Sequence, residues 1–280
     1  MERAVIYGAT GTGKNVYEKI KDKYDVIYFV DEDPMRKGEI LYGKKVCDRE
    51  QLFLERPDVI IMGIITGYNE IVNQLVKDGF YERNIICDFV DLQYRARKVF
   101  LENIATILKE KKEGNVAELG VYRGDFAKII NEVFPNRKLY LFDTFEGFPE
   151  SDWNYERNHK LLKHEGGKMN NTSVEYVLGK MLYPEQCIVK KGYFPETANG
   201  LEDEFIFVNI DTDLYKPILA GLEYFWPRMI EGGYILIHDY FSLTYTGAKK
   251  AVDEFAQRNG LGFTPIGDTL SVAFVKHNGN

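Results

Sequence analysis

The sequence has little cysteine, no excess of positive charge and no long apolar run. Its 280 residues include three cysteines, Cys47, Cys87 and Cys187, with no CxxC pair. A disulfide framework and a cysteine-ligated zinc site are therefore not expected, and we predict reduced thiols. The formal net charge is −7, which leaves no overall positive field to hold a nucleic acid backbone.

Segments that would carry the chain into or across a membrane are also missing from the sequence. No apolar run approaches the roughly 20 residues that a spanning helix needs. The N-terminal MERAVIYGAT lacks a basic region followed by an apolar stretch and a cleavage site. With 45% hydrophobic and 28% charged residues, the composition is that of a globular protein. We expect a cytoplasmic protein with no membrane span and no nucleic-acid partner.

Short apolar runs alternate with helical periodicity in both halves of the chain, which predicts parallel sheets with right-handed crossovers. We therefore predict an α/β protein with two tandem Rossmann-like domains, residues 1–91 and 114–280, connected by a charged helix over residues 92–113. An antiparallel strand pair should close the second domain. The predicted strands cover residues 4–7, 25–30, 58–63, 84–87, 116–119, 138–142, 187–190, 205–210, 234–237, 263–266 and 271–275.

The first glycine-rich turn, YGATGTGKN, resembles two kinds of phosphate-binding loop. A P-loop needs serine or threonine after its lysine to bind magnesium, and Asn15 stands at that position. In the dinucleotide pattern GxGxxG, Gly8 and Gly13 fit the first and last glycines, but Thr10 replaces the middle one. Asp31, after the second strand, is placed to accept from a ribose hydroxyl. The turn is either a nucleotide site formed by Gly8, Gly13 and Asp31, or an empty structural turn.

A longer N-terminal stretch suggests a family for the first domain. GATGTGKNV followed by DVIYFVDEDPMRKGEILYGKKV resembles the N-terminal domain of bacterial sugar O-acyltransferases of the sialic-acid and bacillosamine acetyltransferase type. The resemblance implies a domain that binds a nucleotide-linked sugar. The β-helix repeats that transfer the acetyl group in that family are absent from this sequence, so only the binding function would carry over.

The second domain opens with another strand and glycine turn, ELGVYRG, and its next strand ends at an aspartate. A small residue lets a ligand lie against the backbone at such a turn. ELGVYRGDFAKIINEVFPNRKLYLFDTFEGFPESD, KKGYFPET and FVNIDTDLYKPILAGLEYFWPRMIEGGYILIHDY closely resemble the macrocin O-methyltransferase (TylF-type) family. The resemblance covers residues 116–276 and implies a class I methyltransferase fold. It also implies methyl transfer from S-adenosylmethionine (SAM) to a sugar hydroxyl with a divalent metal, usually magnesium.

This resemblance assigns roles to individual residues. Family members commonly self-associate, so a homo-oligomer is also implied. The SAM contacts carried over from the family pattern fall on Glu118, Gly120, Gly124, Asp143, Thr144, Gly192 and Tyr193.

The metal and catalytic site implied by the resemblance is Asp211, His238 and Asp239. These residues end two strands, and the carboxyl ends of neighbouring parallel strands meet at one sheet edge. Oxygen ligands suit magnesium. Many relatives have a carboxylate in place of His238, whose imidazole also suits softer metals. His238 is therefore a ligand, a base, or a group that orients Asp239, and Asp213 is a neighbouring group or base.

The polar segment 151–171 is the predicted lid or acceptor-binding loop. Its two histidines, His159 and His164, are either acceptor bases or solvated loop residues. Several aromatic side chains near the predicted cleft are candidates for stacking on a sugar. They are Phe145, Phe148, Trp153, Tyr155 and Tyr193.

Three alternative functions compete with methyl transfer to a sugar. Asp211-Thr212-Asp213 is a DxD, the metal signature of many glycosyltransferases. An NAD(P)-dependent nucleotide-sugar enzyme would need a Tyr-x-x-x-Lys pair in the first domain, and no suitably placed pair is found. A non-catalytic nucleotide-sugar-binding protein would not need the intact acidic residues of the second domain.

Overall fold

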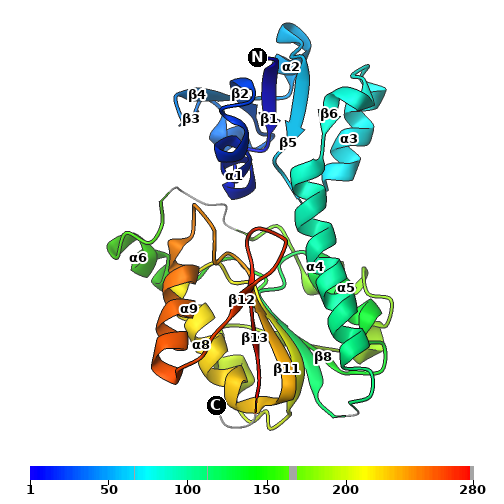
Figure 1. Ribbon diagram of the computed structural model, residues 1–280, viewed down its shortest axis with the longest axis vertical. Helices are drawn as coiled ribbons and strands as arrows, with labels where there is room; N and C mark the ends of the chain where they lie inside the picture. Colours follow the sequence, from blue (N-terminus) through cyan, green and yellow to red (C-terminus); the bar gives the residue numbers. More distant parts are fainter. Residues whose placement is uncertain (66, 112, 164–168, 278–280) are drawn as a thin grey trace. The chain divides into compact units, whose positions relative to one another are not determined.

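The computed structural model describes residues 1–65, 67–111, 113–163 and 169–277. The chain divides into two compact units, Met1–Arg95 and Ala96–Asn280, and each contains its own sheet (Figure 1). The α/β class predicted from the alternating pattern is confirmed. The three cysteines are free thiols, each partly exposed. None of the helices in the described ranges is long and apolar enough to cross a membrane.

The first unit is built around a sheet in the order β3-β4-β2-β1-β5-β6. Its strands pair in parallel except for the antiparallel pair of β3 and β4, a hairpin that the sequence analysis did not predict. The elements are β1 (Arg3–Tyr7), α1 (Gly11–Ile20), β2 (Asp25–Val30), β3 (Ile40–Leu41), β4 (Lys44–Cys47), α2 (Glu50–Glu55), β5 (Val59–Met62), α3 (Tyr68–Lys77) and β6 (Ile85–Ile86), with 3₁₀ turns at Pro34–Arg36 and Glu82–Asn84.

The second unit has a sheet in the order β12-β13-β11-β10-β7-β8-β9, in which β13 runs antiparallel to β11 and β12. The predicted closing strand pair is thus present. The elements are α4 (Asp88–Ile107), β7 (Asn115–Leu119), α5 (Asp125–Val133), β8 (Leu139–Asp143), α6 (Glu150–Asn158), α7 (Val174–Leu178), β9 (Cys187–Lys191), β10 (Phe205–Ile210), α8 (Tyr215–Phe225), β11 (Met229–Ile237), α9 (Thr246–Asn259), β12 (Thr264–Pro265) and β13 (Val272–Val275), with 3₁₀ turns at Pro184–Gln186, Glu196–Ala198 and Trp226–Arg228.

The strand β10 lies at the centre of the second unit, and all of its side chains are buried. Phe205 and Val208 pack into a core shared with α8 and α9, whereas Ile206 and Phe207 pack into a core shared with α4 and α5. Figure 1 shows these two pairs of helices on opposite faces of the sheet. A strand covered on both faces reads as a continuous apolar run, which is why FIFVNI was recognisable in the sequence.

Two helical segments differ from their predicted limits. The helix predicted over residues 92–113 is α4, Asp88–Ile107, and the division between the units falls within it, after Arg95. The predicted loop over residues 151–171 begins as a helix, because α6 covers Glu150–Asn158. Two acidic side chains of this helix, Asp152 and Glu156, are buried.

Candidate active site

The carboxyl ends of β7, β10 and β11 lie side by side in the second unit. β10 pairs in parallel with both neighbours, and the register places Asn209 level with Glu118 and Ile210 level with Ile237. The chain order reverses between β7 and β10, and open α/β sheets bind ligands at such a switch point. Asp211 directly follows the end of β10, and His238 directly follows the end of β11.

Asp211, His238 and Asp239 form a compact cluster at this edge. Nδ1 of His238 lies 3.1 Å from Asp211 Oδ1 and 2.9 Å from Asp239 Oδ2, and one ligand atom from each residue lies within 4.8 Å of the others. Asp213 and Asp239 have positive φ angles of 58° and 61°. Such backbone conformations are costly for non-glycine residues and cluster at functional sites.

The cluster contains more acidic than basic groups. Burial opposes protonation of His238, but the Asp211 and Asp239 carboxylates outweigh it and raise the pKa of the imidazole. Burial would raise the pKa of Asp211, but His238 and Arg97 hold it well below its usual range. Burial and the carboxylates of Asp239 and Asp211 raise the pKa of Asp213. A bound divalent cation would stabilise this concentration of carboxylates.

Arg97 of α4 also belongs to this cluster, and the sequence analysis missed it. Its Nη2 donates to Asp211 Oδ2 at 3.1 Å and to Asn209 Oδ1 at 3.2 Å. The guanidinium carbon lies 4.0 Å from the centroid of the Phe126 ring, within cation–π range. Arg97 and Asp211 are 114 residues apart, so no local spacing in the sequence indicates the pair.

Replacing Arg97 by methionine should lower the free energy of unfolding of the second unit by about 2 kcal/mol, because the largely buried Asp211 carboxylate loses a charge-assisted hydrogen bond while His238 stays beside it. The two side chains are only 13% and 21% exposed. Both tryptophans, Trp153 and Trp226, belong to the second unit, so urea unfolding followed by tryptophan fluorescence measures this unit.

Lys98→Met is the matched control for Arg97→Met, since it removes a positive charge from the same helix. Lys98 is 43% exposed and its contact with Glu102 is 3.8 Å long, so its loss should cost less than about 0.5 kcal/mol. Equal losses in the two variants would contradict the role of Arg97.

Glu118 is buried beside the cluster with one oxygen unpaired. Its Oε1 accepts from Asn209 Nδ2 at 2.8 Å, while Oε2 has no hydrogen-bond partner within the described part of the chain. Burial, and then the Asp211 carboxylate, raise the pKa of Glu118 well above its usual value. An unpaired buried carboxylate oxygen is costly, and a cationic ligand group such as the methionine ammonium of SAM would satisfy it.

Asp143 ends β8 and binds the turn that follows β7. Its Oδ2 accepts from the backbone amides of Val121 at 2.7 Å and Tyr122 at 2.8 Å, and its Oδ1 accepts from that of Phe145 at 2.6 Å. The Thr144 hydroxyl is likewise bonded within its own loop. Asp143 therefore fixes the shape of the turn, and a ribose hydroxyl would have to share its oxygens.

The three glycines predicted to contact SAM have positive φ angles. Gly120 has φ of +86°, and a Cβ there would lie 2.2 Å from the backbone oxygen of Asp211. Gly124 has φ of +72°, and a Cβ there would lie 2.8 Å from Val177 Cγ1; Gly192 has φ of +135°. The fold itself thus requires glycine at Gly120 and Gly124, whether or not a ligand approaches them.

Tyr193 connects the loop after β9 to α6. Its hydroxyl donates to Asp152 Oδ2 at 3.0 Å, and Lys216 Nζ lies 3.5 Å from the other oxygen of this buried carboxylate. Burial and the Asp152 charge raise the pKa of Tyr193 to about 12. The hydroxyl is thus held by protein groups, which leaves the ring as the part of Tyr193 available to an adenine.

The helix α6 is attached to the start of α8 rather than left free over the sheet. Glu156 Oε1 accepts from the backbone amide of Tyr215 at 2.8 Å. His159 stacks on Tyr155 with ring centroids 3.9 Å apart, and its Nδ1 lies 2.9 Å from the Tyr155 carbonyl oxygen. The other histidine considered as a base, His164, lies outside the described residues.

The candidate stacking residues separate into two groups. Phe145 is 5% exposed and packs into the core with α5, which removes it from a ligand surface. Phe148 stacks on Trp153 with centroids 5.4 Å apart, and Tyr155 stacks on Tyr215 at 5.4 Å. These pairs remain candidates for the wall of an acceptor site.

The predicted nucleotide residues of the first unit have structural partners as well. A Cβ at Gly8 would lie 2.5 Å from the Gly63 oxygen, and a Cβ at Gly13 would lie 1.9 Å from the Gly8 oxygen. Asp31 Oδ2 accepts from the Ala9 amide at 2.9 Å. Both glycines are therefore required by close backbone packing, and Asp31 fixes this turn as Asp143 fixes the corresponding turn of the second unit.

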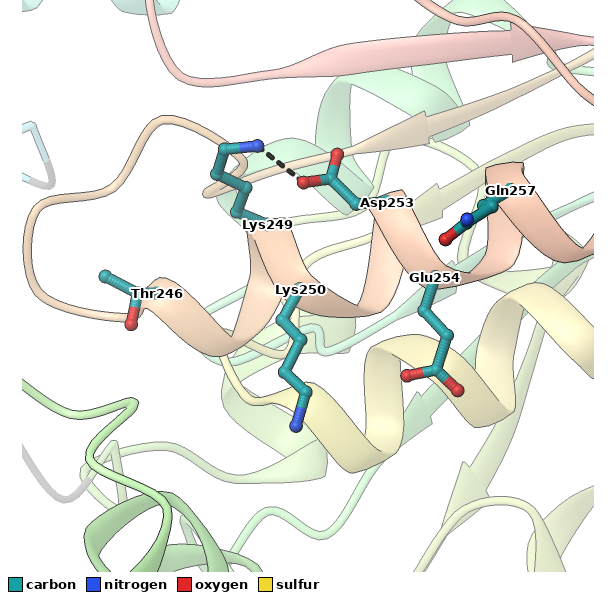
Figure 2. A pocket seen from close by; sticks show the side chains of 6 residues that line it. All are labelled: Thr246, Lys249, Lys250, Asp253, Glu254 and Gln257. Carbon is teal, nitrogen blue, oxygen red and sulfur yellow. Dashed lines mark hydrogen bonds and ion pairs between the residues drawn. The ribbon is translucent and has the colours of Figure 1, made fainter.

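A surface depression of about 480 Å³ lies elsewhere, along α9 (Figure 2). Figure 2 shows Lys249 Nζ paired with Asp253, 2.5 Å from its Oδ2. None of the strand-end residues lines this depression, so we place the chemistry at the sheet edge. The lining residues are Thr246, Lys249, Lys250, Asp253, Glu254 and Gln257.

Comparison with known proteins gives a family for each part of the chain. The family model described as Macrocin-O-methyltransferase (TylF) matches residues 94–274. Residues 1–86 match the family described as C2185-like, N-terminal. The expected resemblance of this part to sugar O-acyltransferases is therefore not supported; the glycine turn and acidic strand end on which it depended are shared by many nucleotide-binding-like folds.

Two curated relatives are 26% identical to the chain over 171 residues, which is 56% of its length. One is the 8-demethyl-8-(2,3-dimethoxy-alpha-L-rhamnosyl)-tetracenomycin-C 4'-O-methyltransferase of Streptomyces olivaceus, of which the match covers 64%. The other is the mycinamicin III 3''-O-methyltransferase of Micromonospora griseorubida, of which it covers 66%. The chain thus spans less than two thirds of the length of these relatives.

Two solved structures share the fold. The O-methyltransferase NovP superposes with a TM-score of 0.55 at 20% identity, over 65% of this chain and 80% of NovP. The calicheamicin methyltransferase CalS11 superposes with a TM-score of 0.54 at 16% identity, over 82% and 90% of the two chains. At these identities the similarity establishes a Rossmann-like methyltransferase fold.

Proposed function

The chain belongs to the macrocin O-methyltransferase (TylF) family, and we propose that its second unit transfers a methyl group from SAM to a sugar hydroxyl. One curated relative is named for a rhamnosyl compound, which supports a sugar acceptor. The acceptor class is a nucleotide sugar, a surface glycan or a glycosylated metabolite. The family and fold favour methyl transfer over the glycosyltransferase and NAD(P)-dependent alternatives.

The observation that carries the proposal is a continuous polar network along one sheet edge. It runs from the unpaired oxygen of Glu118 through Asn209 and Arg97 to Asp211 and His238. One end offers a carboxylate for the ammonium of SAM, and the other end offers carboxylates and an imidazole near a hydroxyl. The two reactants of a methyl transfer would thus be held beside each other, which removes much of the entropic cost of their encounter.

We assign Asp211, His238 and Asp239 as the residues that would hold a divalent cation. The donor set fits one, because two carboxylates and an imidazole face one another in an acidic surrounding. When bound, the cation would lower the pKa of the acceptor hydroxyl, and SAM would supply the methyl group. Nδ1 of His238 faces both carboxylates, so the imidazole would have to lose its proton on that nitrogen before it joined them as a ligand through it.

SAM binding tests the proposal, and Glu118→Gln should weaken it by about 10-fold to 100-fold, the value of a charge-assisted hydrogen bond in a buried site. Isothermal titration calorimetry with SAM and with its demethylated product measures the effect. The matched control is Glu223→Gln, whose side chain is 49% exposed and paired with Arg258; its SAM affinity should stay within about twofold of the unsubstituted protein.

The same titration with NAD separates the competing functions. Binding of NAD without binding of SAM would overturn the methyltransferase proposal in favour of a nucleotide-sugar-modifying enzyme. Binding of neither, with retained binding of nucleotide sugars, would favour a non-catalytic binding protein. Transfer of labelled methyl groups from SAM to a panel of UDP- and dTDP-sugars and glycosides then identifies the acceptor class.

A further inference from the structure

The first unit contains a buried lysine that makes no direct ion pair within the described residues. Lys14 of α1 is 1% exposed, and no described residue makes a hydrogen bond or ion pair with its ammonium group. Burial lowers the pKa of Lys14 to about 8. The nearby Glu39 carboxylate opposes this change, and the charge of Arg36 adds to it. A lysine buried without a hydrogen-bond partner destabilises the folded chain, and an anion bound beside its ammonium group would offset that cost.

The N-terminus of α1 is uncapped next to this lysine. Thr10 is the N-cap residue, its side chain makes no capping hydrogen bond, and the first turn contains no acidic residue. The amides of Gly11, Thr12 and Gly13 have no hydrogen-bond acceptor among the described residues, as the first turn of a helix lacks intrahelical acceptors. Residues 10–12 are partly exposed, so an anion can reach these donors.

From its position on α1, the Lys14 side chain is expected to lean toward this turn. Helical side chains lean toward the N-terminus of their helix, and Lys14 directly follows the first three residues of α1. Arg36, whose charge acts on Lys14, donates from Nη1 to the Ala9 carbonyl of the same turn at 3.4 Å. The Glu39 carboxylate acts on Lys14 as well but pairs with Arg36 at 3.2 Å, so Lys14 shares this carboxylate with a second cation.

We propose that the first unit binds the phosphate group of a phosphorylated small molecule at the N-terminus of α1, with Lys14 as its counter-charge. A phosphate offers several acceptor oxygens to the free amides and the ammonium group together, and helix N-termini favour anions. Asp31 also contacts this turn, but its Oδ2 is engaged by the Ala9 amide. This site differs from the nucleotide site predicted from the sequence. Gly8 and Gly13 are required by close backbone packing, whereas Lys14 and the amides after Thr10 would bind the phosphate.

Calorimetric titration of the full chain with inorganic phosphate, pyrophosphate and UDP tests this site. Pyrophosphate or UDP should bind, and Lys14→Met should weaken that binding by about tenfold or more, because a charge-assisted contact is lost. Tighter binding of UDP than of pyrophosphate would identify a nucleotide as the ligand. Equal affinities for UDP and pyrophosphate would show that the site recognises the phosphate groups alone.

Lys23→Met is the control, because Lys23 follows the same helix but is exposed. This variant should bind the probes as tightly as the unsubstituted chain does. Binding of no probe at 10 mM, about the weakest useful affinity on the millimolar scale, would overturn the proposal. So would unchanged binding by Lys14→Met. If Lys14→Met does not fold, the ¹⁵N chemical shifts of the Gly11 and Thr12 amides in the unsubstituted protein test the site instead. These shifts should change when pyrophosphate is added, and unchanged shifts would reject the site. SAM binding in the second unit is unaffected by either result.

Discussion

Asp211→Asn should lower kcat for methyl transfer by about 10³-fold, within the range that a positioned acid–base or ligand group contributes, while SAM affinity changes by less than about threefold. Asparagine keeps the shape of Asp211 and an oxygen that accepts from Arg97, so the local fold should persist. It removes the negative charge that faces His238 at 3.1 Å. Glu118, the proposed partner of the SAM ammonium group, bonds to Asn209 instead and should keep its position.

The measurement is steady-state methyl transfer with calorimetric SAM binding on the same preparation, with and without a metal chelator. Asp253→Asn is the matched control, since Asp253 is 44% exposed on α9 and pairs with Lys249. It should leave kcat unchanged, which also tests whether the depression on α9 matters for catalysis. An active Asp211→Asn protein, or full activity of the unsubstituted protein in excess chelator, would reject the proposed cation site.

Gly120→Ala should destabilise the second unit by about 3 kcal/mol or more, because left-handed strain and overpacking act at the same residue. Gly120 has φ of +86°, and the added Cβ would lie 2.2 Å from the backbone oxygen of Asp211 and 2.9 Å from Thr212 Cγ2. Backbone atoms cannot move aside as a flexible side chain can. The turn after β7 and the loop after β10 must therefore separate, which displaces Asp211 from His238.

The control for Gly120→Ala is Gly260→Ala, in the same unit. Gly260 has φ of +63° at the end of α9, and nothing lies within 4 Å of a Cβ built there. Its replacement should cost only about 1 kcal/mol, the strain of the left-handed conformation alone. Urea unfolding followed by tryptophan fluorescence compares the two variants. A difference of less than about 0.5 kcal/mol, the usual scatter of surface substitutions, would show that the turn and loop separate without cost.

The strand-end aspartates and histidine could be predicted because parallel strands obey a simple geometric rule. The runs FIFVNI and YILI are buried on both faces and therefore read as apolar segments, and the residues after them must meet at one edge. This rule brings Asp211 to His238 without any knowledge of the loops. The alternation of strands and helices likewise determined the α/β class.

Several residues of the site could not be found in this way. Arg97 reaches Asp211 only because α4 packs on the sheet through Leu101 and Ile104, and nothing near Arg97 in the sequence indicates that contact. The polar composition of residues 151–171 suggested a lid or acceptor-binding loop, but Asp152 and Glu156 of α6 find buried partners in Tyr193 and Tyr215. Burial of a charged side chain depends on distant partners, which composition does not reveal.

The sequence by itself determined the alternation of strands and helices, the glycine turns and the acidic residues at the strand ends, because these depend on local periodicity and on backbone conformations that few residues adopt. The tertiary structure decided which polar groups are satisfied. Among the described residues, Glu118 keeps an oxygen without a donor and Lys14 is buried without a direct ion pair, whereas Asp143 is engaged by the turn through both oxygens. Hydrogen-bond satisfaction is a property of atoms brought together from distant segments, so it emerges only when the chain is folded.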